Sequence, residues 1–121
     1  MWKINFDEAF VLDVLSILIV KEARVSNQAK KITLLNEIDR IQKEIIDQYG
    51  KDKFTKLMNS REVDELTYAN EIVFELVEQA EKDKGLANEI AEANLERWER
   101  KNKIQKKFFK KNTKEVKVSK I

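Results

Sequence analysis

The chain has no proline and only two glycines, Gly50 and Gly85, in 121 residues. Proline and glycine mark turns, and a sheet needs a turn between neighbouring antiparallel strands. A chain almost without them, in which 38% of the residues are charged, is typical of long helices joined by short connections. The sequence therefore predicts an all-α fold, and its length favours one domain.

The first predicted helix, residues 7–24, is apolar on almost every side. A helix with this pattern lies inside a fold or at a subunit interface, because it leaves no polar face for water. Its β-branched residues would also suit a buried strand, but the apolar stretch is long and no partner strand is evident. A chain this small covers such a helix only partly, so we expect a homodimer.

The rest of the chain predicts three more helices from apolar residues three and four apart: residues 27–48, 61–82 and 86–110. Ser26 or Asn27 can start the second helix, Gly50 can end it, and Ser60 can cap the third. Residues 51–60 form the one long connection, in which we expect a short helical turn.

The short links predict two antiparallel helical hairpins that form a four-helix, bundle-like domain over residues 1–110. Residues 111–121 lack apolar periodicity and are predicted to be a basic, flexible tail. Residues 100–121 contain ten cations against Glu115, a net charge of +9, which leaves −7 on residues 1–99 of a chain whose total is +2. An acidic body thus carries a basic end.

Cysteine and histidine are both absent. This excludes disulfides, thiolate nucleophiles, cysteine-ligated zinc and all catalysis that depends on an imidazole. Any enzyme built from this chain would work with carboxylates, lysine, arginine, asparagine or hydroxyls, and with a hard metal ion such as Mg²⁺. The preferred interpretation needs no cofactor.

The apolar run at residues 11–20 resembles the core of a signal peptide. It contains Asp13, however, and Lys21 and Glu22 follow it in place of a small-residue cleavage site. The run is also too short to span a bilayer. We therefore expect a buried helix and a cytoplasmic chain with no membrane span.

The last predicted helix carries polar residues within its apolar face. At about 100° per residue, seven residues fall within roughly 80° of one another: Leu86, Ile90, Asn94, Arg97, Lys101, Ile104 and Phe108. The three polar members lie in the middle, and Asn70 lies in the apolar face predicted for the helix at 61–82.

Two interpretations of these polar residues are open. In one, Arg97 and Lys101 hold an anionic group in a pocket between the third and fourth helices. In the other, a buried network fixes the bundle and Arg97 pairs with Asp13 or Glu78, since a polar residue in an apolar helix face can set register. We favour the network.

Carboxylates recur three residues apart, which places each pair on one helix face: Glu44 and Asp47, Glu62 and Glu65, Glu75 and Glu78, and Glu78 and Glu81. Such pairs could bind Mg²⁺ across two helices. The stretch Glu62-Val63-Asp64-Glu65 resembles in part the first acidic motif of MazG-type nucleoside-triphosphate pyrophosphohydrolases, although no downstream Glu-x-x-Asp follows it.

That resemblance implies an alternative function, a Mg²⁺-dependent hydrolase of a nucleotide or sugar nucleotide. Four glutamates would hold the metal: Glu62, Glu65, Glu75 and Glu78. Arg97 and Lys101 would then bind phosphate. In a chain this rich in glutamate we favour a solvated acidic face.

The basic end offers a third function. Its lysines could contact nucleic-acid phosphates or an acidic membrane surface, with contacts expected at Lys106, Lys107, Lys110 and Lys111. A run of lysines is more often a solubilising end, so we rank nucleic acid below a protein partner.

Four separated segments resemble an uncharacterised family of short, all-helical bacterial and phage proteins, sometimes encoded near glycosyltransferase genes. The segments are these: Asp13, Ser16-Ile17-Leu18 and Lys21; Asn36-Glu37-Ile38; Asn70, Phe74, Leu76 and Glu78; and Asn94, Arg97, Lys101 and Ile104. The chain departs from the family where relatives carry a Gly-Glu pair and other charges in the first helix: Ala9, Phe10, Val14 and Ile19.

The family has no established activity, so the resemblance implies a set of residues rather than a reaction: Asp13, Lys21, Asn70, Glu78, Asn94, Arg97 and Lys101. It is consistent with a non-enzymatic accessory or interaction protein, phage-encoded or envelope-associated. If viral, such a protein would act in the host cytoplasm.

Overall fold

The computed structural model describes residues 8–82 and 84–109, and every regular element in them is helical. The described part contains five α-helices and one short 3₁₀ helix, η1: α1 (Glu8–Arg24), α2 (Gln28–Tyr49), α3 (Lys51–Met58), α4 (Arg61–Ala80), η1 (Lys84–Leu86) and α5 (Ala87–Phe108). The predicted all-α class is confirmed.

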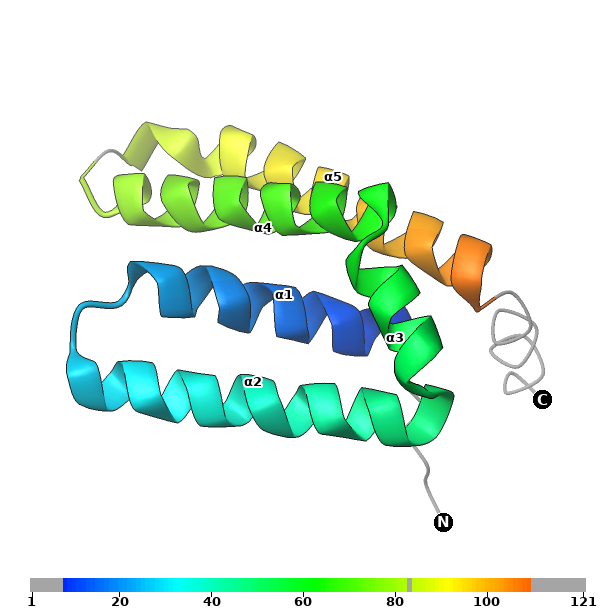
Figure 1. Ribbon diagram of the computed structural model, residues 1–121. Helices are drawn as coiled ribbons and strands as arrows, with labels where there is room; N and C mark the ends of the chain where they lie inside the picture. Colours follow the sequence, from blue (N-terminus) through cyan, green and yellow to red (C-terminus); the bar gives the residue numbers. More distant parts are fainter. Residues whose placement is uncertain (1–7, 83, 110–121) are drawn as a thin grey trace, which may run out of the picture.

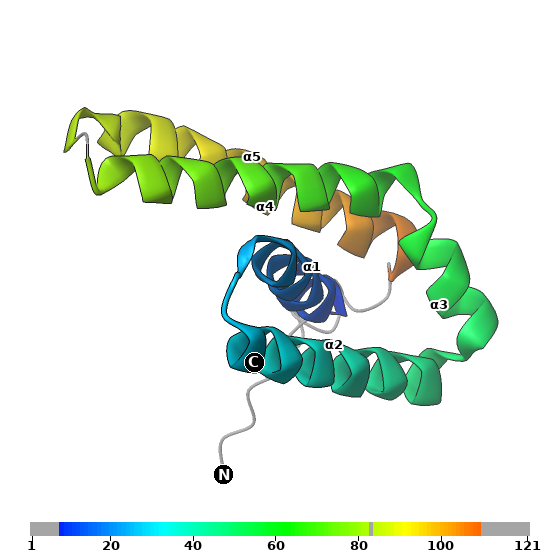
Figure 2. The ribbon, with the colours of Figure 1, turned by 60° about the vertical axis from the view of Figure 1, so that its left-hand side comes forward.

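The helices form a bundle with α1 at its centre (Figures 1 and 2). The adjacent helices α4 and α5 make one layer, α1 lies beneath them, and α2 lies beneath α1. The short helix α3 links the end of α2 to the start of α4 across these layers (Figure 1). Because α1 contacts α2, α4 and α5, the helix with the least polar sequence occupies the most enclosed position.

Local signals fix where the helices begin and end. Asn27 Oδ1 accepts a hydrogen bond from Lys30 N at 3.0 Å and Ser60 Oγ accepts one from Val63 N at 3.2 Å, as N-cap residues do. Gly50 has a φ of 91° and donates its N–H to the carbonyl of Ile46 at 2.7 Å. The chain therefore turns out of α2 at a backbone conformation that favours glycine.

The connection at residues 51–60 contains more structure than the single turn that was expected. Its helix α3 is eight residues long and directs Leu57 into the core, where the side chain is fully buried. Burial of a leucine stabilises a short helix that would be marginal alone.

One hydrophobic core runs through the bundle. Its buried residues come from every α-helix and from the residue after α5: Ala9, Leu12, Leu15, Ile38, Ile41, Ile45, Leu57, Val63, Leu66, Ile104 and Phe109, with Ala69 and Ala93 also buried. The apolar spacing in the predicted helices at 27–48 and 61–82 also points Leu35 and Val77 inward, but these side chains are exposed, at 47% and 49%. Figure 2 shows that the α4–α5 hairpin extends beyond α1, and Val77 lies in the last turn of α4.

None of the described helices combines the length and apolar character that crossing a bilayer requires.

Candidate functional site

Asp13, on the central helix, is the hub of a buried polar cluster and is 3% exposed. Its Oδ1 accepts hydrogen bonds from Asn70 Nδ2 at 2.9 Å and from Arg97 Nε at 3.2 Å. Its Oδ2 accepts from Arg97 Nη2 at 2.7 Å and also from Nε at 3.2 Å. One carboxylate thereby joins α1 to α4 and α5.

Hydroxyl groups extend the cluster along α4. Asn70 Nδ2 also donates to Ser16 Oγ at 3.1 Å, and the Ser16 hydroxyl donates to Thr67 Oγ1 at 3.2 Å. Thr67 in turn donates to the carbonyl of Val63 at 3.0 Å. Each hydroxyl thus accepts one hydrogen bond and donates another, and the last donor of the series bonds to a backbone carbonyl.

The outer edge of the cluster is formed by α5. The Arg97 side chain is 30% exposed, and its Nη1 donates to Asn94 Oδ1 at 3.3 Å. Asn94 is exposed, so the prediction that it lies within the apolar face of the helix is wrong. Lys101 is one turn further on, with its Nζ 6.0 Å from the centre of the Phe10 ring.

The cluster acts chemically as a closed network. Among the described residues, no buried side-chain nitrogen or oxygen lacks a hydrogen-bond partner. Both oxygens of Asp13 are occupied by donors, so this carboxylate offers no ready position for a metal ion or for a substrate proton. Of the two interpretations of the polar residues, the geometry fits the network and the pairing of Arg97 with Asp13.

The structure places the other two members of the predicted set elsewhere. Lys21 and Glu78 both line a groove where the end of α1 meets α4 and the start of α2. Glu78 Oε1 lies 3.8 Å from Arg24 Nη1. The groove has a volume of about 570 Å³ and its apolar lining includes Val25 and Phe74.

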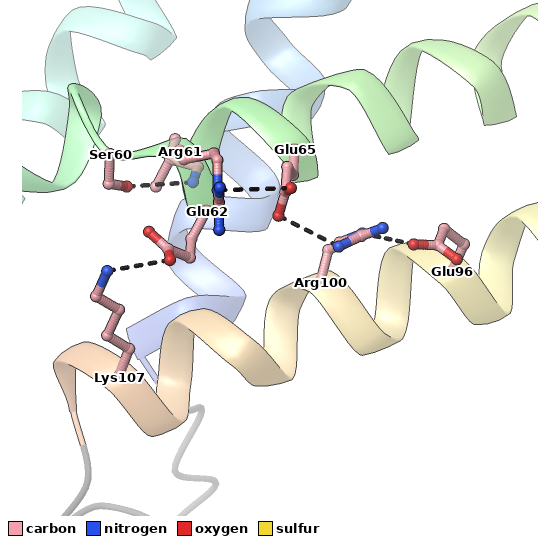
Figure 3. Close-up of polar contacts among 8 residues, drawn as sticks. Ser60, Arg61, Glu62, Glu65, Glu96, Arg100 and Lys107 are labelled. Carbon is pink, nitrogen blue, oxygen red and sulfur yellow. Dashed lines mark hydrogen bonds and ion pairs between the residues drawn. The ribbon is translucent and has the colours of Figure 1, made fainter.

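The four glutamates considered for Mg²⁺ divide between the two ends of α4. Figure 3 shows the first end, where Glu62 accepts from Lys107 Nζ at 3.0 Å and Glu65 from Arg100 Nη1 at 3.2 Å. Arg100 also pairs with Glu96 (Figure 3). This hydrogen bond from Lys107 is the main cause that lowers the pKa of Glu62 below its ordinary value.

At the other end of α4, Glu75 and Glu78 face Arg24, at 2.8 Å and 3.8 Å. Each of the four carboxylates therefore faces a cation. The described residues contain no group of three or more acidic side chains placed to hold a metal ion.

The lysines considered for nucleic acid lie at the end of α5 and beyond it. Lys106 and Lys107 are both exposed, and Lys107 faces Glu62 and lies 5.3 Å from the centre of the Phe108 ring. Lys110, Lys111 and the predicted tail lie outside the described residues.

The sequence did not identify Gln105, which is 5% exposed. Its Oε1 accepts from Ala9 N at 3.0 Å, and its Nε2 donates to Glu8 Oε1 at 3.0 Å and to the carbonyl of Phe109 at 3.2 Å. The Gln105 side chain thus provides a hydrogen-bond partner for the N–H of Ala9 at the start of α1 and for the carbonyl of Phe109 after α5, groups that a helix end leaves without a partner in the helix. The one available signal was an uncharged amide in a lysine-rich stretch, beside Ile104.

Comparison with known proteins found no match to a protein-family model, to a curated protein or to a solved structure.

Proposed function

We propose that this chain is a non-enzymatic interaction protein that self-associates through the uncovered face of α1. The observation that carries the proposal is the position of that helix, which has α2 on one side and the α4–α5 layer on the other (Figure 2). One face remains between them. Its apolar side chains are three and four residues apart and only half-buried: Phe10, Val14, Ile17 and Leu18.

Exposed side chains border this face. Val11 is 37% exposed beside it on α1, and Trp98 is 56% exposed on α5. Because Lys101 reaches the ring of Phe10, α5 flanks the face, and Trp98 lies one turn before Lys101 on the same helix. Two such surfaces paired about a twofold axis would remove this apolar area from water, with Trp98 as the anchor.

The buried cluster around Asp13 supports a non-enzymatic role, because its donors and acceptors are used within the fold. Three residues of the predicted set, from three different helices, meet at the Asp13 carboxylate: Asp13 itself, Asn70 and Arg97.

Light scattering on the purified chain tests the proposal. We expect a homodimer of the 14.3 kDa chain at micromolar concentration. Ile17→Glu should shift the equilibrium to monomer, because the dimer would bury two carboxylates at its interface, one from each copy of the chain. Ile32→Glu is the matched control, since Ile32 is 50% exposed on α2 and lies outside the face.

A wild-type chain that stays monomeric at micromolar concentration contradicts the proposal. A dimer that Ile17→Glu leaves intact, with a native circular dichroism spectrum, would place the interface elsewhere.

A further inference from the structure

The groove at the end of α1 has an apolar lining built from three helical segments. Val25 follows α1, Leu34 lies on α2 and Phe74 lies on α4, and all three side chains are half-buried. The volume of about 570 Å³ is in the range of sites that hold small organic molecules. The lining can therefore accept an apolar body of modest size.

One wall of the groove is fixed. The Arg24 guanidinium lies 5.2 Å from the centre of the Phe74 ring, and its Nη2 donates to Glu75 Oε1 at 2.8 Å. Glu78 lies 3.8 Å from the same guanidinium. These contacts hold Phe74 and Arg24 in place and account for the one carboxylate in the lining.

Two further cations line the groove and have no such partner. Lys21 and Lys30 are exposed, and no hydrogen bond or ion pair joins either ammonium group to another side chain in the described ranges. The lining of the groove thus carries three cations and one carboxylate, whereas residues 1–99 together carry a net charge of −7. A site with positive charge on an acidic body favours an anion.

We propose that this groove binds a free amphipathic organic anion, such as a medium-chain carboxylate. The hydrocarbon packs against Val25, Leu34 and Phe74, and the carboxylate lies between Lys21 and Lys30. The hydrophobic contact supplies affinity and the two ammonium groups select a ligand with an anionic head. The inference does not depend on self-association.

Isothermal titration calorimetry of the full chain with decanoate, below its micellar concentration, tests this site. We expect saturable binding of one decanoate per chain. Lys21→Ala combined with Lys30→Ala should weaken it on the order of fivefold to tenfold, as expected for two exposed charge contacts. The matched control, Lys56→Ala with Lys103→Ala, removes two exposed lysines outside the groove and should leave the affinity unchanged.

Two comparisons make the result decisive. Leu34→Asp should abolish binding while the circular dichroism spectrum stays native, and neutral decanol should bind more weakly than decanoate. No saturable binding, equal losses in the two lysine pairs, or equal affinity for decanol would each overturn the proposal. So would binding to vesicles of anionic lipid without binding to free decanoate. Light scattering on the same samples measures self-association separately, so a failure of ligand binding can be distinguished from a failure to form the dimer.

Discussion

Arg97 Nη2 lies 2.7 Å from Asp13 Oδ2, although 84 residues separate the two along the chain. Asn70 donates to the same carboxylate, so three helices meet at one buried charge. A pair of this kind contributes little compared with a well-packed apolar pair, but the loss of one partner leaves an uncompensated charge. We therefore expect the contact to matter more for which helices pack together than for the total free energy of folding.

We expect Arg97→Met to lower the free energy of unfolding by about 3–5 kcal/mol, because Asp13 stays buried without its cation. Urea unfolding followed by circular dichroism measures the change. Arg40→Met is the control, since Arg40 pairs with Glu37 and Glu44 on the exposed surface of α2 and should cost less than about 1 kcal/mol. Equal small losses in the two variants would contradict a structural role. Asp13→Leu combined with Arg97→Met should recover much of the loss.

Gln105→Ala should lower the free energy of unfolding by about 1–3 kcal/mol. The change leaves the N–H of Ala9 and the carbonyl of Phe109 without their partner, in a place that water reaches poorly. Hydrogen exchange at the start of α1 should accelerate in the same variant, which locates the effect. Gln79→Ala, an exposed amide at the end of α4, should change neither measurement. A Gln105 variant as stable as the wild type would show that these backbone groups find other partners.

The ion pair between Glu62 and Lys107 predicts a pH dependence. Because the pKa of Glu62 is lowered in the folded chain, its contribution is complete above the ordinary value of 4.5 and is lost as the pH falls through the folded-state pKa. The thermal midpoint of Glu62→Gln should therefore lie below that of the wild type at pH 6 and converge with it near pH 3. Glu99→Gln, which changes an exposed glutamate on α5, serves as the control. If the thermal midpoints of Glu62→Gln and the wild type still differ at pH 3, the difference does not come from the charge of Glu62.

Gly50→Ala should lower the free energy of unfolding by about 1–3 kcal/mol, because its φ of 91° with a ψ of 155° strains any residue with a side chain. The cost should come from the backbone alone, since nothing lies within 4 Å of the added Cβ. Gly85 lies within the 3₁₀ helix η1, a conformation with negative φ, so Gly85→Ala should be close to neutral. Thermal and urea unfolding of the two variants should separate them clearly. Equal stabilities would mean that α2 can end without this conformation.

The helix ends could be predicted from the sequence, because they depend on residues that are close together along the chain. Asn27, Gly50 and Ser60 act at the helix ends where their local chemistry placed them. The pairing of Arg97 with Asp13 was one of two possibilities, because a helical wheel shows which side chains share a face and not which helix lies opposite.

The predictions that were wrong or missing concern side chains whose burial depends on how the helices pack against one another. Asn94 shares a face with Arg97 on the wheel, yet it lies outside the contact with α1 and is exposed. Val77 lies in the last turn of α4 and is exposed, although its spacing places it on the same helix face as Asn70. The role of Gln105 depends on a contact 96 residues away in the chain, which periodicity within one helix does not reveal.

The single side chain of Gln105 holds together Glu8, Ala9 and Phe109, which lie at the two ends of the described chain. A chain shortened to residues 8–109 would therefore have ends that a short linker can join, and it could then be opened elsewhere without breaking the core. New termini can be placed between α4 and α5, where Glu81, Lys82 and Gly85 are exposed. The bundle is therefore suited to circular permutation, with α5 leading the chain and α1 following it directly.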